Sequence, residues 1–463
     1  MNFKQILSFA IGPIGAAALG LLSVPIAAWL FTPEDIGKMS LVVVIASFCN
    51  LVFNLGLDQA YVREYFESKN KPRLLRMTFF PGFLILIFFL LILILFSTQL
   101  LQIAFGISDL WTFLVISLYI LTVYISRYVT LILRMQGRGF AYSISQFTPK
   151  LLLIMVFASY WLLSLSIEFK YLIIANFIAL FLTTLFYIWS TRVEWQRAIA
   201  STTDIAKLKS MLVFGTPLIF ASLFFWGITS LDRIFLRYYS GFEELGIYSV
   251  SVNFAGVAII LQSVFSTVWA PIVYKWLADG DDLNKVFSVT YWMVVIIGLF
   301  FSLSGLFSWL IPYLLPANFS DVQYIFIACL GYPLFYTLSE TTVVGINITK
   351  TTKYAMFAAF IALCINIICN YILVPLYGAK GAAISTAVSF WFFFVARTEL
   401  ANRVWVPIKN KNIIHIVTLV YLLMIILFVL FGDNYFTAFF YAFLFLAISC
   451  SFSILLLFKN VRL

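Results

Sequence analysis

Charged residues are scarce in this sequence, and histidine is almost absent. Only 10% of the 463 residues are Asp, Glu, Lys or Arg and one is His, whereas 63% are hydrophobic and 19% are aromatic. A chain of this length with so little polar surface cannot form a soluble domain. The composition therefore predicts an integral membrane protein.

The sequence also lacks the signatures of metal sites, disulfide frameworks and nucleotide-driven machines. Its five cysteines lie within apolar runs and form no CxxC pair, and His415 has no partner for a metal site or a nucleophilic triad. No P-loop, HExxH or GxSxG motif occurs. We therefore expect no cofactor, no metal and no enzymatic domain, so that any energy source is an ion gradient or the substrate itself.

Apolar runs of about 20 residues, the length a helix needs to cross ~30 Å of hydrocarbon, recur along the whole chain. Their length rules out a porin-like barrel, whose strands alternate over about ten residues. The predicted fold is an all-α membrane bundle of about 14 transmembrane helices. The fourteen predicted spans cover residues 7–31, 39–57, 78–97, 112–133, 141–163, 170–190, 211–237, 246–270, 287–310, 323–346, 354–376, 381–398, 413–431 and 436–457.

The basic residues give the predicted orientation. Of the 29 Lys and Arg, 22 fall in segments on the side of the N-terminus, five fall in the opposite loops, and Arg127 and Lys150 lie within spans. The positive-inside rule then places both termini in the cytoplasm. The net charge of +10 is spread over short loops and is not gathered on one domain, so no nucleic-acid partner is expected.

A faint internal repeat suggests two related halves. TPEDIGKMSL at residues 32–41 matches GFEELGIYSV at residues 241–250, with a Gly and a Ser aligned at a shift of 209. This repeat predicts two six-helix bundles, residues 1–200 and 201–405, that enclose a central cavity, followed by two additional transmembrane helices in residues 406–463. Chance matching of a few Gly and Ser positions is the alternative.

Residues 214–251 carry a polar stripe through an apolar run. Trp226, Arg233 and Arg237 fall close to one helical face, and Asp232 stands beside Arg233. A cation at bilayer depth costs about 2.5 to 3.5 kcal/mol unless it is paired or hydrated, so this face is expected to border an aqueous interior. Alternatively, the helix ends early and both arginines lie at the interface.

Other polar residues within spans are expected to face the same cavity. Asn50, Asn54 and Asp58 stand four residues apart on one helical face, and Gln146 precedes Lys150 by four residues. An ionisable residue within a span indicates function by default, which favours a functional role for Lys150. For Arg127, snorkelling toward the cytoplasmic surface is an equal alternative.

Two further polar positions lie in the second half of the chain. Glu340 is either a proton or cation carrier or the counter-ion of one of the basic residues, and the sequence leaves both readings open. Asn366 lies one helical turn before Asn370 within an apolar run.

Four motifs, in order along the chain, resemble a known family. They are FTPEDIG (residues 31–37), NLGLDQAYVREY (54–65), LDRIFLRYYSGFEELGIYS (231–249) and NYILVPLYGAKGAAIST (370–386). Together they resemble the polysaccharide-export branch, the Wzx-type O-antigen flippases, of the multidrug/oligosaccharidyl-lipid/polysaccharide (MOP) exporter superfamily. Many members of that branch are described with twelve spans, whereas this chain is predicted to have fourteen, as the lipid II flippases of the superfamily do.

The resemblance implies a function for each group of polar residues. Such a protein moves an undecaprenyl-pyrophosphate-linked oligosaccharide across a bacterial inner membrane by alternating access, with a glycan polymerase and a chain-length regulator as further partners. The basic side chains would bind the pyrophosphate, the neutral polar ones would contact sugars, and the acidic ones would couple to a proton or sodium gradient or act as counter-charges. The three sets are Arg127, Lys150, Arg233 and Arg237 for pyrophosphate; Asn50, Asn54, Gln146, Trp226 and Asn366 for sugars; and Asp58, Asp232 and Glu340 for coupling or counter-charge.

Three other functions stay open at this stage. A lipid II flippase has the same predicted number of spans. A drug/cation antiporter of the same superfamily shares the fold, but it is expected to have an acidic cavity, whereas the set of polar residues here is basic. A membrane-embedded glycan polymerase or ligase is expected to carry a sizeable outer loop, which this sequence lacks.

Overall fold

The computed structural model of the chain describes residues 3–163, 168–280, 284–349, 351, 353–408 and 410–461. Helices make up the regular structure of these residues, and no β-strand occurs among them. Most of the helices are long and apolar. The predicted all-α membrane fold is therefore confirmed.

The chain divides into two compact units after Trp226, which lies within α10 (Ile205–Tyr239). α10 thus contributes its first part to one unit and its last part to the other. The predicted boundaries after residues 200 and 405 were based on a sequence repeat. They stay predictions, because the compactness of a unit does not test a repeat.

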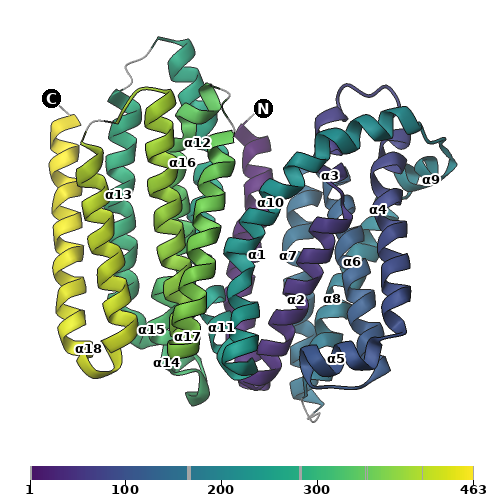
Figure 1. The fold of residues 1–463 in the computed structure, drawn as a ribbon, viewed down its shortest axis with the longest axis horizontal. Coiled ribbons are helices and arrows are strands. Elements are labelled where there is room, and N and C mark those ends of the chain that lie inside the picture. Colours follow the sequence, from purple (N-terminus) through teal and green to yellow (C-terminus); the bar gives the residue numbers. More distant parts are fainter. Residues whose placement is uncertain are drawn as a thin grey trace. The chain divides into compact units, whose positions relative to one another are not determined.

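The helices of the first unit pack mainly in pairs. α1 packs along α7, α6 packs along α8, and α2 packs against α6. The short helices α5 and α9 lie at opposite ends of this unit (Figure 1). Besides the first part of α10, its helices are α1 (Phe3–Leu30), α2 (Pro33–Phe53), α3 (Leu57–Glu64), α4 (Lys71–Ile94), α5 (Ser97–Phe105), α6 (Leu110–Met135), α7 (Gly139–Leu162), α8 (Phe169–Ser190) and α9 (Arg192–Ala200).

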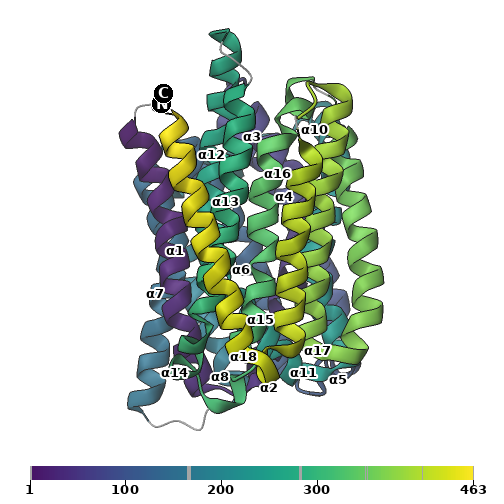
Figure 2. The ribbon, with the colours of Figure 1, turned by 90° about the vertical axis from the view of Figure 1, so that its left-hand side faces the viewer.

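The second unit contains two long helices, α17 and α18, each of which folds back on itself as a hairpin. α16 packs along α17, and α13 packs along α18. In Figure 2 the yellow-green half of α18 runs down to a turn, and its yellow half returns beside it. The helices that follow α10 are α11 (Gly241–Phe254), α12 (Gly256–Ala278), α13 (Asn284–Leu306), α14 (Ile311–Leu314), α15 (Val322–Cys329), α16 (Gly331–Ile348), α17 (Lys353–Val404) and α18 (Lys411–Val461), with 3-10 turns at Ser308–Leu310 and Ala317–Phe319.

The two hairpins reconcile the number of helices with the predicted number of spans. Non-helical backbone angles at Gly378 (φ 52°, ψ −129°) and Tyr435 (φ −127°, ψ 33°) divide α17 and α18 into two spans each. Eleven helical segments of the described chain are long and apolar enough to cross a membrane, with each hairpin counted once. The returning halves of the hairpins and α1 complete the set. Every predicted span therefore coincides with helical structure.

Two predicted spans are broken helices rather than continuous ones. Residues 246–270 are divided between α11 and α12 at Ala255, and residues 323–346 are divided between α15 and α16 at Leu330. A glycine, Gly256 or Gly331, follows each break. Glycine disfavours a helix interior by about 1 kcal/mol relative to alanine, which makes these positions suitable for a break.

Two of the sequence motifs begin helices through carboxylate caps. In FTPEDIG, the Thr32 Oγ1 accepts a hydrogen bond from the Asp35 amide (3.2 Å) and the Asp35 carboxylate accepts one from the Thr32 amide (3.3 Å), which forms a capping box for α2. In GFEELGIYS, the Glu244 Oε2 accepts a hydrogen bond from the Ala379 amide (2.7 Å). Glu244 therefore caps the returning half of α17 just after Gly378.

The NLG segment (Asn54, Leu55 and Gly56) separates α2 from α3 and brings the backbone of this turn close to that of α10. Leu55 (φ 51°) and Gly56 (φ 68°) both adopt left-handed conformations, which end α2 and reorient the chain before Asp58. Gly56 lies directly against Gly215 of α10, and a Cβ on Gly215 would be 2.9 Å from the Gly56 carbonyl. Only glycine fits at this crossing.

The crossing predicts a stability difference between two glycine substitutions. Gly215→Ala should lower the stability of the protein by about 1–3 kcal/mol, because the added Cβ meets backbone atoms that cannot move aside. Gly20→Ala in α1 is the matched control, since a Cβ there meets nothing within 4 Å. Thermal unfolding of the two purified variants measures the difference. Equal melting temperatures would contradict the close approach.

Candidate functional site

Asp58 and Arg127 form an ion pair in the first unit. The Arg127 Nη2 and Nε donate to the Asp58 Oδ2 at 2.8 Å and 3.2 Å. Asp58 is the second residue of α3, and Arg127 lies in the C-terminal half of α6. The Asp58 side chain is 13% exposed and that of Arg127 is 39% exposed, so the arginine is the more accessible partner. The sequence identified both residues but did not indicate that they pair.

The Asp58–Arg127 pair lines a polar cavity of about 170 Å³. Asn54 is buried within its wall, and its Oδ1 has no hydrogen-bond partner among the described residues. The Asn54 Nδ2 donates to the Asn50 Oδ1 (2.8 Å), which ties the two predicted sugar-contacting residues together. The described residues that line it are Asn50, Leu51, Asn54, Gly56, Asp58, Gln59, Arg127, Leu218, Ile219 and Ser222.

Trp226 packs against the same face of α2 that carries this cavity. Its Nε1 donates to the Ser47 Oγ (2.9 Å), and its ring lies 5.0 Å from that of Phe48. Ser47 precedes Asn50 and Asn54 by about one and two helical turns. Trp226 is thus held near the polar residues of α2 but is not among the residues that line the cavity.

Lys150 and Gln146 lie apart from this cavity, on α7. Both side chains are partly buried, and neither makes a hydrogen bond or ion pair with another described residue. Ser143 of α7 lies one turn before Gln146, and its backbone is in close contact with Gly12 of α1. Lys150 is therefore a cation within a span with no protein counter-charge among the described residues.

Asp232 is the centre of a buried hydrogen-bond network in the second unit. It is fully buried, and its Oδ1 accepts hydrogen bonds from the Nδ2 atoms of Asn366 (3.1 Å) and Asn370 (2.6 Å). Its Oδ2 accepts one from the Tyr248 hydroxyl (2.7 Å) and another from the Thr386 hydroxyl. Four neutral donors, from α11 and both halves of α17, thus surround one carboxylate.

This network changes the interpretation of two predicted residues. Asn366 was expected to contact sugars, but its side chain is fully buried and bonds to Asp232. Asp232 and Arg233 are adjacent in sequence, yet Arg233 Nη1 donates to the Thr229 carbonyl (2.9 Å) instead. Tyr248 and Thr386 were not identified, because no sequence pattern relates residues of three separate helical segments to one carboxylate.

The two arginines of α10 both lie within the helix. α10 continues to Tyr239, two residues beyond Arg237, so the alternative in which the helix ends before them is wrong. The guanidinium of Arg237 lies 4.2 Å from the centre of the Phe242 ring, and that of Arg233 lies 5.8 Å from the Tyr248 ring. Cation–π contacts of this kind position a guanidinium while leaving its hydrogen-bonding edge accessible.

Glu340 is the counter-ion of a residue that sequence reasoning missed. The Arg397 Nη1 donates to the Glu340 Oε1 (2.9 Å) and to the Ser339 hydroxyl (3.1 Å). The Arg397 guanidinium also lies 4.3 Å from the Phe393 ring centre. Both side chains are largely buried. Arg397 stands at the end of the predicted span 381–398, and it was not singled out from the sequence.

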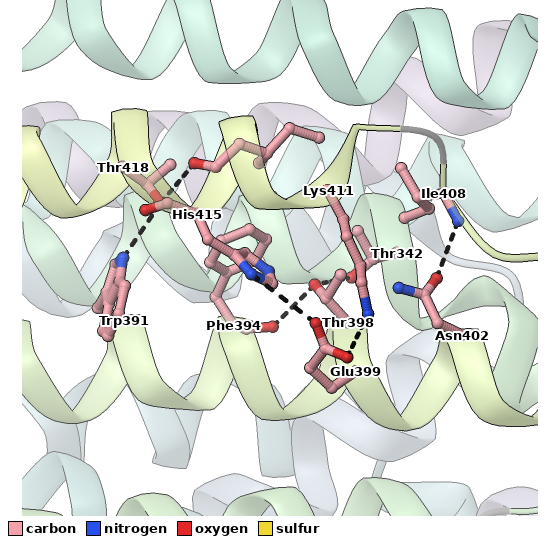
Figure 3. Close-up of polar contacts among 11 residues, drawn as sticks. Thr342, Trp391, Phe394, Thr398, Glu399, Asn402, Ile408, Lys411, His415 and Thr418 are labelled. Carbon is pink, nitrogen blue, oxygen red and sulfur yellow. Dashed lines mark hydrogen bonds and ion pairs between the residues drawn. The ribbon is translucent and has the colours of Figure 1, made fainter.

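A second charged cluster lies where α17 meets α18 (Figure 3). The Lys411 Nζ is 2.6 Å from the Glu399 Oε2, and the His415 Nδ1 is 3.8 Å from the Glu399 Oε1. His415 was expected to lack the partners that a metal site or a nucleophilic triad needs, and in the structure it lies beside the Glu399 carboxylate. Among the described residues, no group of three or more His, Cys, Asp or Glu could hold a metal ion.

Comparison with known proteins relates this arrangement to a family. The sequence matches the family described as "Polysaccharide biosynthesis protein" over residues 3–276, more than half of the chain. The chain belongs to this family. The predicted resemblance to the polysaccharide-export branch of the MOP superfamily is thereby confirmed. A search of curated proteins returns no significant match.

Solved structures share the fold at low sequence identity. The lipid II flippase MurJ, in an inward closed conformation, superposes with a TM-score of 0.70 and 18% identity over 98% of this chain and 99% of MurJ. A Vibrio cholerae MATE transporter gives a TM-score of 0.57 at 12% identity, covering 87% of this chain and 96% of its own. An inward-facing multidrug resistance MATE transporter of the MOP superfamily gives 0.58 at 12% identity, with 85% and 98% covered. The protein is thus a multi-pass membrane protein with the fold of flippases and transporters.

The Glu340–Arg397 contact predicts a stability difference between a single and a double substitution. Glu340→Gln leaves the Arg397 guanidinium buried without its carboxylate, at an expected cost of about 3–5 kcal/mol. Combining Glu340→Gln with Arg397→Met removes both charges and should recover most of that loss. Thermal unfolding of the purified variants measures both values. A double variant no more stable than the single one would show that the pair is not a structural contact.

Proposed function

We propose that this protein is a flippase that moves an undecaprenyl-pyrophosphate-linked oligosaccharide, such as an O-antigen repeat unit, from the cytoplasmic to the periplasmic leaflet of a bacterial inner membrane. Its membership of the polysaccharide biosynthesis family and its MurJ-like fold support a lipid-linked glycan substrate. The activity breaks no covalent bond, so the protein acts as a transporter and not as an enzyme. Both termini lie in the cytoplasm, as the positive-inside distribution predicts.

The observation that carries this proposal is the polar cavity around Arg127. The Arg127 guanidinium lies in its wall, and its Nη1 makes no hydrogen bond to a described residue. The side-chain Oδ1 of Asn54 also has no described partner, and Asn50 and Ser222 add polar side chains. Arginine binds phosphate oxygens through charge-assisted hydrogen bonds, and amides and hydroxyls match sugar hydroxyls. Trp226, held against the same face of α2, adds an aromatic surface for a sugar ring.

Lys150 is the second cationic site of the proposal. An unpaired ammonium group within a span is costly, and an anionic substrate that passes beside it would compensate this cost. Gln146 lies one turn away on the same helix and offers an amide to the attached sugar. In the second unit, Arg233 and Arg237 would provide the corresponding cations, since both keep part of their surface accessible.

Coupling to an ion gradient is assigned to Asp232. The negative charge of a buried carboxylate that has only neutral donors around it is not neutralised, and binding of a proton or a sodium ion would neutralise it. Each of its four partners also carries an oxygen, on the side-chain amides of Asn366 and Asn370 and on the hydroxyls of Tyr248 and Thr386. Rotation of the two amides would present an oxygen-only ligand set, which hard cations prefer.

Ion binding at Asp232 would act on the hairpin formed by α17. Asn366 and Asn370 lie on its outgoing half and Thr386 on its returning half, so occupancy of the carboxylate changes how the two halves are held together. Such a two-state contact is what alternating access requires to convert an ion gradient into directed movement. Asp58 and Glu340 carry paired charges in this structure and are therefore not assigned this role.

Two related functions are the alternatives. A lipid II flippase would use the same pyrophosphate-binding groups, and the MurJ-like fold favours it. A drug/cation antiporter is favoured by the MATE-like fold, but the charges of Lys150, Arg233 and Arg237 are positive and repel cationic drugs. A glycan polymerase and a chain-length regulator are the expected protein partners of the proposed flippase.

The role of Lys150 predicts a loss of transport without a loss of protein. Lys150→Ala should abolish glycan export, because no other cation replaces the ammonium group at that position, whereas Lys150→Arg should retain part of it. The measurement is the amount of exported glycan in a strain that depends on this gene, normalised to the amount of protein in the membrane. Lys69→Ala, at an exposed lysine without a described partner, is the control. Normal export by Lys150→Ala would remove Lys150 from the mechanism.

The role of Asp232 predicts a loss of gradient stimulation. Asp232→Asn keeps the shape of the side chain but removes the charge that a proton or sodium ion must neutralise. In proteoliposomes, the wild type should flip its substrate several-fold faster with a proton or sodium gradient than without one, and the ratio for the variant should fall to about one. A variant that keeps the wild-type ratio would show that coupling occurs elsewhere.

A further inference from the structure

The ion pair between Asp58 and Arg127 uses only part of each charged group. Three donors converge on the Asp58 Oδ2: the Arg127 Nε and Nη2 and, at 3.3 Å, the Gln59 Nε2. Among the described residues, none donates to the Oδ1, and the Arg127 Nη1 has no acceptor. The pair is therefore not the fork-to-fork arrangement, with two oxygens and two nitrogens, that makes Arg–carboxylate contacts strongest.

Asp58 and Arg127 are held in place by different parts of the backbone. Arg127 lies beside Tyr124 and Tyr128 on α6, whose hydroxyls donate to the carbonyls of Phe79 (2.9 Å) and Thr78 (2.7 Å) and fix this helix against α4. Asp58, in contrast, follows the left-handed residues of the NLG segment. Its Oδ1 accepts no hydrogen bond from a described residue, so rotation of the Asp58 side chain can separate the carboxylate from Arg127 while the Leu55–Gly56 backbone keeps its contact with Gly215. Asp58 is therefore the partner that can move, by rotation of its side chain.

The charges in the cavity balance in this structure. Among the described residues that line it, Asp58 and Arg127 alone are charged, and the remaining polar ones are neutral. An anion that approaches Arg127 consequently meets a site whose positive charge is already compensated. It must take the place of the Asp58 carboxylate to gain the full interaction with the guanidinium.

On the basis of the proposed function, we infer that Asp58 is an internal competitor for the substrate's pyrophosphate group. When the pyrophosphate binds, it displaces Asp58 from Arg127, and when it leaves, Asp58 takes its place again. Arg127 therefore always has an anionic partner, and the substrate is held weakly enough to be released. Asp58 tunes affinity and turnover in opposite directions without holding the substrate itself.

The Glu340–Arg397 pair, in the same chain, is an ion pair that an incoming anion is not expected to displace. Arg397 is 13% exposed at its side chain, compared with 39% for Arg127, and an aromatic ring covers its guanidinium. The Arg127 guanidinium instead borders the cavity. Competition is thus expected at Arg127 and not at Arg397.

The test is the binding of farnesyl pyrophosphate, a soluble prenyl pyrophosphate, to the full-length protein purified in detergent. Titration calorimetry measures the affinity, and farnesol is the uncharged control ligand. Asp58→Asn should bind farnesyl pyrophosphate roughly tenfold or more tightly than the wild type, because close charge pairs couple by at least this factor. Arg127→Gln should bind it at least about tenfold more weakly. Asp109→Asn removes one carboxylate from a solvent-exposed pair and should leave affinity unchanged.

The outcomes separate the inference from the proposed function. If the wild type binds farnesyl pyrophosphate and Arg127→Gln binds it weakly, but Asp58→Asn binds it no more tightly than the wild type, Asp58 orients Arg127 and does not compete, and the inference is wrong. If wild type and Arg127→Gln bind farnesyl pyrophosphate no better than farnesol, the pyrophosphate site itself is wrong. Should Asp58→Asn not fold, Asp58→Ser tests the same competition, with the same outcomes.

Discussion

A charge within the hydrocarbon region of a membrane must meet an opposite charge, a set of hydrogen-bond donors or water. The charged residues within the helices meet this constraint to different degrees. Arg397 is sealed against Glu340 and an aromatic ring, Asp232 is surrounded by four neutral donors, and Arg127 shares its carboxylate with a polar cavity. Lys150 has none of these partners among the described residues. We propose that the degree of compensation distinguishes contacts that stabilise the fold from sites that bind a ligand.

The backbone irregularities lie beside these charges. The left-handed residues before Asp58 allow α3 to present its carboxylate to α6, and the missing side chains of Gly56 and Gly215 let α10 pass close to that turn. In the second unit, Glu244 caps the helix that follows the turn at Gly378, and this turn lets Asn370 and Thr386 bond to the two carboxylate oxygens of Asp232. The sequence motifs thus encode turns and caps first, and the polar networks follow from the positions of those turns.

The spans were predictable from sequence because apolar run length and basic-residue asymmetry are local signals. The identities of most charged site residues were predictable for the same reason, since a charge inside an apolar run is conspicuous. Their partners were not. Helical periodicity relates Asn50 to Asn54, but it does not relate Asp58 to Arg127 or Asp232 to Thr386, which are 69 and 154 positions apart. The hydrogen bond from Asn366 to Asp232 and the pairing of Arg397 with Glu340 were not predicted, because both depend on such long-range pairing.

The central claim is that cations within these helices move an anionic, lipid-linked glycan. Its most direct test is reconstitution of the wild-type protein in proteoliposomes that carry a fluorescent undecaprenyl-pyrophosphate oligosaccharide in one leaflet, with accessibility to a membrane-impermeant quencher as the readout. The account predicts protein-dependent movement of this lipid to the opposite leaflet and no movement of the corresponding uncharged polyprenol glycoside. Absence of lipid movement, together with export of a small organic cation by the same vesicles, would contradict it.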